Sequence, residues 1–405
     1  MTEPWRSIRA GVLACLTALA AGCATASFEQ PPPFDDGAMR ERAESVVEDE
    51  IRFSATIPSI EESRRIFGVD LSEKKIQPVW VEIENATNRL IYFLRTGLDP
   101  EYFSPREIAF AMSESMTVEA RRHLAEHVEA LKLRDPVKPG TTQSGFVFTN
   151  RDRGRKFLSV DLLSQGWSTH MTLLVSVPDR SISEEKIQGI YTRIAETTPV
   201  QVDTESKLRE LLEKLPCCAA DENGVQGEPL NVVLIGTIEA TGAALVRRGF
   251  HYAPAGSMYV FGRPQDLSLK KGTSAWVPAQ PHVLRAWLTD IRFEGKLVWI
   301  GQVSMPLGGR FGDAAMDARV SNIDPDVDTI RNDFLQDSFY SQRVAEIGFV
   351  KGVGSVAIER PRTTPGGSTY HTDGLRVVVI YAEDPLSLTE IEFIGWERLL
   401  DHRPR

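Results

Sequence analysis

Apolar and polar positions alternate in short runs through the first half of the chain, as they do in β-strands. Residues 51–57 alternate in this way, after a charged, alanine-containing segment, 39–49, that predicts a short helix. Two runs rich in β-branched and aromatic residues follow at 78–84 and 89–94. The turn-forming residues between them, 85–88, predict that the two runs form a hairpin.

A helix and three further strands complete the first half. Apolar residues at helical spacing predict an amphipathic helix over residues 117–133. A Pro-Gly turn then leads into three closely spaced strand-like runs: 144–149, 156–161 and 169–175. This order predicts a small antiparallel β-sandwich with one inserted helix over residues 46–178. The pattern is similar to the immunoglobulin-like modules of bacterial envelope proteins.

Strands and helices are mixed in the second half. Residues 179–224 carry apolar stripes at helical spacing and are predicted to be a helical connector. A buried strand at 230–236 and a helix at 239–248 then open a second domain, residues 225–400. Further strands are predicted at 257–261, 283–291, 296–304 and 375–382, with a hairpin turn at 293–296. The chain is therefore predicted to be an α+β multidomain protein, whose second domain has a mainly antiparallel sheet with helices packed on it.

Six short blocks of the second domain occur in the order found in one known family, namely 229–236, 247–250, 261–267, 282–287, 297–301 and 323–331. Together they resemble the LssY C-terminal domain family over residues 229–400. Members of this family often carry the domain beside membrane-embedded modules, some of them phosphatase-like. The activity of the domain itself is not established, so the resemblance implies no catalytic residue. Where the family tends to show a doubled histidine, this chain has Gln280-Pro281-His282.

The first residues have the order of a secretory signal. Arg6 and Arg9 precede an apolar stretch that ends in small residues and Cys23. The stretch is shorter than the roughly 20 residues that a membrane-spanning helix needs. Residues 19–23 resemble the lipobox of bacterial lipoproteins, although the leucine lies one position further from the cysteine than usual. Residues 1–22 are therefore predicted to be a lipoprotein signal peptide and Cys23 the acylated first residue of the mature chain. A plain signal peptide is the alternative.

Residues 23–45 are predicted to be a flexible tether, because they lack apolar periodicity and contain three consecutive prolines. Ala24, directly after the cysteine, resembles lipoproteins sorted to the outer membrane of Gram-negative bacteria. These features predict a location on the periplasmic face of the outer membrane, with the lipid on Cys23 as the membrane contact. The net charge of −10, from 46 basic and 56 acidic residues, argues against nucleic acid as a partner.

After Cys23, the chain contains one further pair of cysteines, the adjacent Cys217 and Cys218. In an oxidising compartment such a pair can form a vicinal disulfide. Two unlinked thiols are the interpretation that we favour, because one adjacent pair lacks the spacing of a redox or metal-binding motif.

A row of carboxylates in the second domain is a candidate metal site. Asp324, Asp326 and Asp328 alternate as in the first half of an EF-hand loop, but the glycine and the glutamate that complete such a loop are missing. A calcium site is therefore a weak candidate, and we expect Asp328 to cap a helix over residues 329–336. Arg331 is expected to pair with Asp328 or Asp324 inside the domain.

His282, Arg285 and Asp324 are the residues to test as an active site, because a histidine moves protons near neutral pH and a guanidinium binds anions. His282 and Arg285 are three positions apart, however, so on a strand they point to opposite faces. The sequence contains no nucleophile elbow, phosphate loop or dinucleotide-binding motif. No cofactor is predicted.

Two classes of function fit these features. A lipid-anchored binding or assembly module with a protein partner in the cell envelope would need the tether and the sandwich and would need no catalytic motif. The alternative is a periplasmic hydrolase acting on an envelope phosphoester or lipid, suggested by the modules that accompany the family and by His282, Arg285 and Asp324. Whether the chain is an enzyme stays open at this level.

Overall fold

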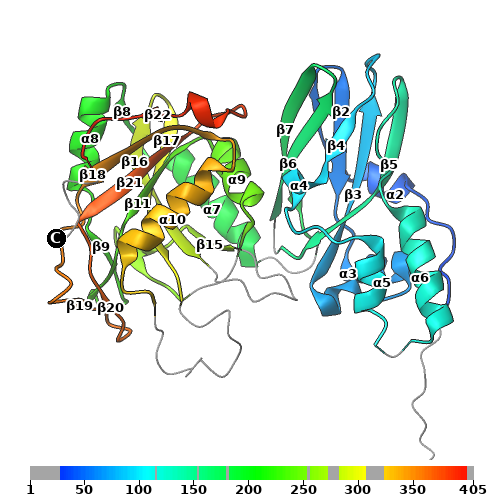
Figure 1. The fold of residues 1–405 in the computed structure, drawn as a ribbon, viewed down its shortest axis with the longest axis horizontal. Coiled ribbons are helices and arrows are strands. Elements are labelled where there is room, and N and C mark those ends of the chain that lie inside the picture. Colours follow the sequence, from blue (N-terminus) through cyan, green and yellow to red (C-terminus); the bar gives the residue numbers. More distant parts are fainter. Residues whose placement is uncertain are drawn as a thin grey trace, which may run out of the picture.

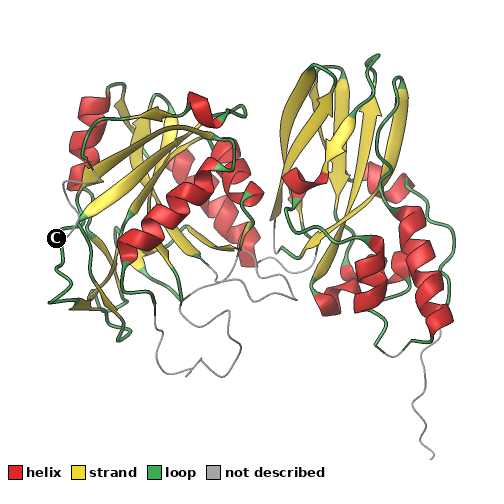
Figure 2. Ribbon diagram, in the orientation of Figure 1, coloured by secondary structure: helices red, strands yellow, loops and turns green. Residues whose placement is uncertain are grey.

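The computed structural model describes residues 28–114, 116–152, 155–178, 182–252, 256–271, 282–306 and 323–398. The predicted signal peptide and Cys23 lie outside the described residues. The described chain is a mixed α/β protein built largely from antiparallel sheets (Figure 2). Figure 1 shows two bodies side by side, which we call the N-terminal unit (residues 28–178) and the C-terminal unit (residues 182–398).

Two antiparallel sheets form the N-terminal unit. The four-stranded sheet has the order β1 (Glu44–Glu48), β2 (Ile51–Thr56), β3 (Ile76–Asn85), β5 (Thr141–Asn150). The three-stranded sheet has the order β4 (Tyr92–Leu94), β6 (Arg155–Ser164), β7 (Trp167–Ser176). Alternate apolar residues of the two sheets, such as Phe53, Val81 and Val160, share one hydrophobic core. The period of two in the sequence therefore places one face of each sheet in this core.

Helices cover the other face of the four-stranded sheet. Trp80 and Phe146 point to this face and pack with apolar residues of the helices. The helical segments on this face are α2 (Gly37–Glu41), α3 (Ile60–Phe67), η2 (Leu71–Lys74), α5 (Pro105–Ala111) and α6 (Val118–Leu131). The short helix α4 (Arg95–Leu98) lies against β6, and its Leu98 belongs to the core between the two sheets. Helix α3 begins with a capping box between Ser59 and Glu62. The prediction of one inserted helix was therefore too sparse, although α6 lies where that helix was expected.

Two predictions for this unit are wrong in detail. Residues 78–84 and 89–94 do not form a hairpin, because β3 and β4 belong to different sheets. The Asn85 side chain redirects the chain: its Oδ1 accepts hydrogen bonds from Thr87, and its Nδ2 donates to the carbonyl oxygen of Arg89. The helix predicted over 39–49 ends early, since its second half is strand β1.

One large sheet forms the centre of the C-terminal unit. Its strands run in the order β12 (Phe250–Tyr252), β15 (Leu267–Lys271), β16 (Val283–Phe293), β17 (Lys296–Ser304), β11 (Val232–Gly236), β21 (Leu375–Tyr381), β18 (Val344–Lys351) and β22 (Glu392–Phe393). Outside this order, β8 (Val200–Val202) pairs with β16. Most neighbours are antiparallel, as predicted, and β11 pairs with β21 in parallel. Glu294 and Gly295 both have positive φ, 50° and 78°, which confirms the tight turn predicted between β16 and β17.

Each face of the large sheet has its own cover. Residues such as Leu234, Leu284 and Trp299 pack beneath α7 (Ile182–Glu196), α9 (Ile238–Arg247) and α10 (Val327–Phe339). The opposite face, with Trp287 and Ile300, packs with α8 (Glu205–Lys214) and with residues of a small sheet. That small sheet has the order β10 (Gln226–Pro229), β9 (Cys218–Ala220), β13 (Tyr259–Val260), β14 (Arg263–Pro264). A short hairpin, β19 (Arg362–Thr363) with β20 (Thr369–Tyr370), and the turn η4 (Leu388–Glu390) complete the unit.

The segment predicted as a helical connector, residues 179–224, contains more than helices. Besides α7 and α8 it supplies β8 to the large sheet and β9 to the small sheet. Leu208 and Leu212 of α8 are fully buried in the core of the C-terminal unit. The connector is thus largely an integral part of this unit.

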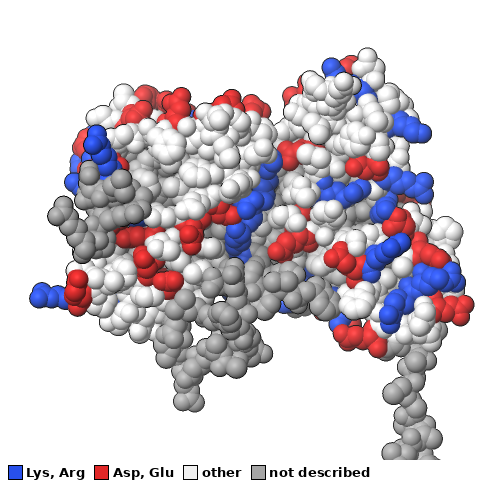
Figure 3. Space-filling view, in the orientation of Figure 1, with Lys and Arg blue, Asp and Glu red and all other residues white. Residues whose placement is uncertain are grey.

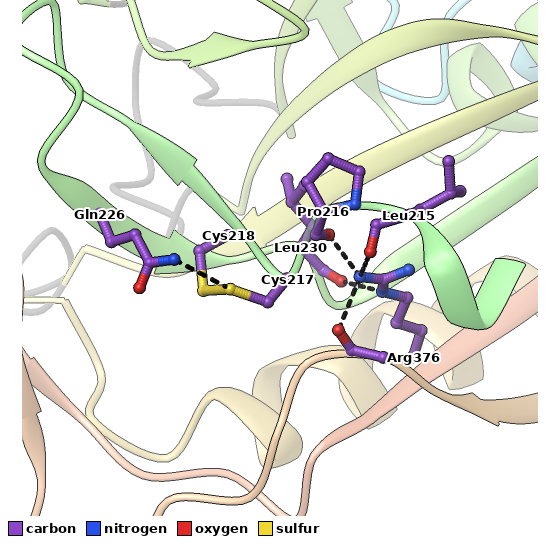
Figure 4. Close-up of a disulfide and its surroundings, with 8 residues drawn as sticks. Leu215, Pro216, Cys217, Cys218, Gln226, Leu230 and Arg376 are labelled. Carbon is purple, nitrogen blue, oxygen red and sulfur yellow. Dashed lines mark hydrogen bonds between the residues drawn. A yellow bond between two sulfur atoms is a disulfide. The ribbon is translucent and has the colours of Figure 1, made fainter.

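Cys217 and Cys218 are joined as a vicinal disulfide at the start of β9 (Figure 4). The preference for two unlinked thiols was therefore wrong. The side chain of Arg376 lies nearby and donates to carbonyl oxygens of Leu215 and Pro216, which fixes the backbone just before the disulfide. Within the part of the chain that the structure describes, no helix is both long and apolar enough to cross a membrane.

Candidate functional site

The two units meet where helix α9 lies against strand β6 (Figure 1). Gly242 permits this approach, because a Cβ atom at that position would lie 2.7 Å from the ring of Phe157. Further along the helix, Arg247 Nη1 donates to Asp161 Oδ1 at 3.0 Å. Asp161 Oδ1 also accepts a hydrogen bond from His170 Nδ1 at 2.8 Å. Apolar contact and a bridged ion pair therefore join the units.

A second arginine lies close to this ion pair. Arg343 is fully buried, and its Nε and Nη2 atoms have no hydrogen-bond partner among the described residues. Burial and the neighbouring charge of Arg247 lower the pKa of Arg343 to about 10. Burial also lowers the pKa of His170, despite the hydrogen bond to Asp161. Figure 3 shows a band of Lys and Arg side chains along this junction.

A cavity of about 170 Å³ lies at the same junction. Phe157 and Leu174 of the N-terminal unit form one side of the cavity. The C-terminal unit supplies apolar side chains from α7, α9 and the large sheet, namely Ile190, Leu234, Ile238, Leu245, Phe250 and Leu269. Most of the lining surface is apolar, so the cavity binds water weakly, whereas an apolar group that enters it gains favourable free energy by leaving water.

One end of the cavity is polar. Asp152 and His251 both line it, and His251 Nδ1 lies 3.2 Å from Asp152 Oδ1. Lys156 Nζ donates to Asp152 Oδ2 at 2.5 Å and to the carbonyl oxygen of Asn150 at 3.0 Å. The other ring nitrogen of His251, Nε2, is buried and has no hydrogen-bond partner among the described residues. The Asp152 carboxylate thus orients the imidazole and leaves its second nitrogen for a ligand.

The charges of these groups are coupled. Burial opposes ionisation of Asp152, but the charges of Lys156 and His251 outweigh burial and lower the pKa of Asp152. Burial likewise opposes protonation of His251, but the charge of Asp152 and its hydrogen bond raise the pKa of His251 above 6.5. Lys156 and Asp152 are almost completely buried, so solvent screens their charges weakly.

Three further residues that line the cavity carry a buried polar atom without a hydrogen-bond partner among the described residues. These atoms are the hydroxyls of Thr241 and Tyr252 and the indole Nε1 of Trp299. Thr241 and Trp299 are 6% and 5% exposed, so bulk water does not compensate them. All three can donate a hydrogen bond, and Trp299 can only donate. An apolar space with several unsatisfied donors has the character of a ligand site.

Most of the elements around this cavity belong to a region of the chain that matches a known protein family. Residues 238–375 match the family model described as LssY C-terminus. These residues form an LssY C-terminus domain. The resemblance noted in the sequence is thereby confirmed, and a comparison with curated proteins found no match. The LssY domain contributes α9, β12, β15 and β17 to the cavity, whereas β11, α7 and the N-terminal unit lie outside the matched residues.

Two sequence candidates of the LssY domain, His282 and Arg285, lie on opposite faces of the large sheet. His282 precedes β16 and faces Lys271, Asp333 and Asp337, and burial lowers its pKa. Arg285 points to the other face, since it interacts with Glu228 of the small sheet. The strand spacing had predicted this divergence. The two side chains do not share one site.

The three candidate metal-binding aspartates of the LssY domain make structural hydrogen bonds and ion pairs instead. Asp326, rather than Asp328, caps α10, because its Oδ1 accepts from the backbone N–H of Thr329 at 3.0 Å. Asp328 instead pairs with the fully buried Arg331 at 3.2 Å, which confirms the predicted salt bridge. Asp324 Oδ1 accepts from the N–H of Asp326. Among the described residues, no three His, Cys, Asp or Glu side chains gather as a metal-binding cluster.

Sequence reasoning missed His251, Asp152 and Trp299. His251 and Asp152 are 99 positions apart, on either side of the junction between the units. Trp299 is buried and lines the cavity, and its indole N–H has no hydrogen-bond partner among the described residues. The one local signal was a histidine in a short strand beside the matched block 247–250, which alone does not indicate a ligand.

Proposed function

We propose that the protein is a cell-envelope lipoprotein that binds a small ligand with an apolar body in the cavity between its two units. The observation that supports this function is the cavity itself: apolar walls from both units, with His251, Thr241, Tyr252 and Trp299 presenting unsatisfied polar atoms. In this proposal the chain is anchored through acylated Cys23 on the periplasmic face of the outer membrane.

The size of the cavity limits the ligand. An apolar cavity of roughly 150 Å³ holds one benzene molecule, so about 170 Å³ accommodates about six to eight carbon atoms. Each buried methylene group contributes about 0.8 kcal/mol, so a six-carbon chain gains enough for a dissociation constant on the order of 1 mM. Longer chains extend through the mouth toward solvent.

Two features support the envelope location. The order of charged, apolar and small residues before Cys23 is typical of a lipoprotein signal. The vicinal disulfide between Cys217 and Cys218 is compatible with an oxidising compartment such as the periplasm. We further propose that the N-terminal unit is an immunoglobulin-like sandwich, which receives an envelope protein partner. Intact-mass analysis of membrane-extracted protein tests the anchor: we expect acylated Cys23, and a soluble product cleaved elsewhere would refute it.

Binding is tested with hexanol, a neutral six-carbon probe, by following methyl resonances of the protein during titration. We expect shifts confined to residues around the cavity. Leu267→Trp should fill part of the cavity and abolish these shifts, because Leu267 lines it. Leu388→Trp is the matched control, since Leu388 is 57% exposed and does not line the cavity. Shifts that survive Leu267→Trp, or that never appear, would contradict the proposal.

A second candidate function, hydrolysis of an envelope ester, rests on a different observation from the one in the sequence. His251 lines the cavity, is oriented by a carboxylate and has an unpartnered Nε2 among the described residues, which are the features of a general base for an attacking water. His282 and Arg285 do not contribute to this arrangement. Turnover of an aryl hexanoate ester that disappears in His251→Ala, with the fold retained, would favour the hydrolase. Binding of hexanol without turnover would favour the binding module.

A further inference from the structure

When His251 is protonated, the positive charges around the polar end of the cavity outnumber the carboxylates there. Lys156 of the N-terminal unit and His251 of the C-terminal unit face Asp152 and Asp99. On the C-terminal side, Asp266 lines the cavity and is held by two arginines, Arg193 and Arg263. Among the described side chains, four cations therefore oppose three carboxylates, which leaves room for one further negative charge.

The existing carboxylates are already satisfied. Asp99 is fully buried and accepts hydrogen bonds from the backbone N–H groups of Glu101 and Asn150. Asp266 Oδ2 accepts from the backbone N–H of Leu288 at 2.8 Å in addition to its arginines. Neither carboxylate is therefore free to become the acceptor for His251 Nε2. That acceptor has to come from a molecule inside the cavity.

We propose that the cavity binds a monocarboxylic acid with a short alkyl chain, whose carboxylate accepts a hydrogen bond from His251 Nε2 while the chain packs against the apolar walls. This inference rests on the proposed binding function and names its ligand class. The carboxylate also suits the other unsatisfied groups, because Trp299, Thr241 and Tyr252 can each donate to an oxygen. An amine is disfavoured, since a protonated imidazole repels it and Trp299 offers no lone pair.

Protonation of His251 makes this binding pH-dependent. The hydrogen bond from Nε2 requires the imidazolium, because Nδ1 already donates to Asp152. Lys270 is the cross-strand neighbour of His251 on β15. The charges of Asp152 and Asp99 raise the pKa of the ring above 6.5, although burial and the charge of Lys156 oppose this. The cation is therefore present at pH 6 and is lost as the pH rises through the raised value. We expect affinity for the carboxylate to fall over the same range.

The experiment compares hexanoate with hexanol in the full-length protein. Both probes share the alkyl chain and differ in the charged headgroup. At pH 6 we expect hexanoate to bind about tenfold more tightly or better, since a charge-assisted hydrogen bond is stronger than a neutral one. His251→Gln should remove this advantage, so that hexanoate then binds no more tightly than hexanol does to the same variant. His170→Gln is the matched control, because His170 also pairs with an aspartate at the junction but does not line the cavity.

The outcomes separate the two proposals. If hexanol binds and hexanoate binds no more tightly, the carboxylate proposal is wrong and the binding function stands. If neither probe binds, both are wrong. If His251→Gln does not fold, the pH dependence in the unaltered protein decides: an advantage of hexanoate that persists unchanged at pH 9 would overturn the role of His251.

Discussion

Arg376 offers a direct test of how the C-terminal unit is held together. Its side chain is fully buried, yet no carboxylate contacts it among the described residues; all of its hydrogen bonds go to backbone carbonyl oxygens (Figure 4). Nη1 donates to Leu212 at 2.7 Å and Nη2 to Leu215 at 3.0 Å, at the end of α8. Nε donates to Leu230 at 3.0 Å, just before β11. One guanidinium thus caps a helix and ties it to the sheet.

Arg376→Met retains the length of the side chain and removes every donor. The carbonyl groups at the carboxyl end of α8 carry negative partial charge and would lose their one buried cation. Each buried acceptor left without a partner costs about 1–3 kcal/mol, while removal of the buried charge recovers part of its desolvation cost. We therefore expect a net loss of about 3–5 kcal/mol in the free energy of unfolding. Arg376→Lys keeps the charge with fewer donors, so its loss should be smaller.

Urea unfolding followed by tryptophan fluorescence measures this loss, because Trp287 and Trp299 are buried in the same unit. Arg52→Met is the matched control: Arg52 is half exposed and pairs with the exposed Glu84, so the variant should lose less than about 1 kcal/mol. If Arg376→Met loses no more than this control, water replaces the guanidinium at the carbonyl oxygens. The reasoning about a buried cap would then be refuted.

Three other predictions follow from the structure. Glu228→Gln should stabilise the protein at pH 8 and not at pH 4 in thermal unfolding, because burial raises the pKa of Glu228 and folding disfavours its charge as the pH rises above 4.5. Glu62→Gln should destabilise it at pH 7 and not at pH 2, because the hydrogen bond from Arg42 lowers the pKa of Glu62 to about 2 and this stability is lost as the pH falls from 4.5 through that value. Gly242→Leu should separate α9 from Phe157 and speed proteolysis between the units, whereas Gly395→Leu, where a Cβ atom meets nothing within 4 Å, should not.

The sequence predicts well those elements that depend on local chemistry. The Glu294-Gly295 turn follows from its residues, because both positions adopt positive φ and a two-residue hairpin needs this. Strands β16 and β17 were found because both are long and rich in β-branched, aromatic and other apolar residues. The helix α10 was expected near Asp328, but its cap is Asp326. Either aspartate can cap, and Asp328 is occupied by Arg331 of the same helix and by hydrogen bonds from the distant Thr372 and Asp373.

Elements that depend on distant contacts were not predictable. The runs that became β3 and β4 look like the two arms of a hairpin, and only the side chain of Asn85 and the second sheet separate them. The site at the junction was missed for the same reason, because it depends on contacts between residues that are far apart in the sequence. Asp152 lies in a loop and His251 in an edge strand, and both are ordinary residues in such places. The sequence around each residue therefore does not reveal their contact. The two residues meet because the two units dock against each other, and the sequence pattern does not reveal how the units dock.

The cavity therefore belongs to the pair of units and to neither alone. The LssY domain supplies Phe250, His251 and Leu269, but Phe157 and Asp152, which close the cavity and orient the histidine, come from the N-terminal unit. Without that unit, His251 would lose the carboxylate that raises its pKa, and the apolar side chains beneath α9 would be more exposed to water. Ligand affinity and docking of the units are then coupled: a ligand that contacts both sides stabilises their association by the same free energy with which the association strengthens its binding.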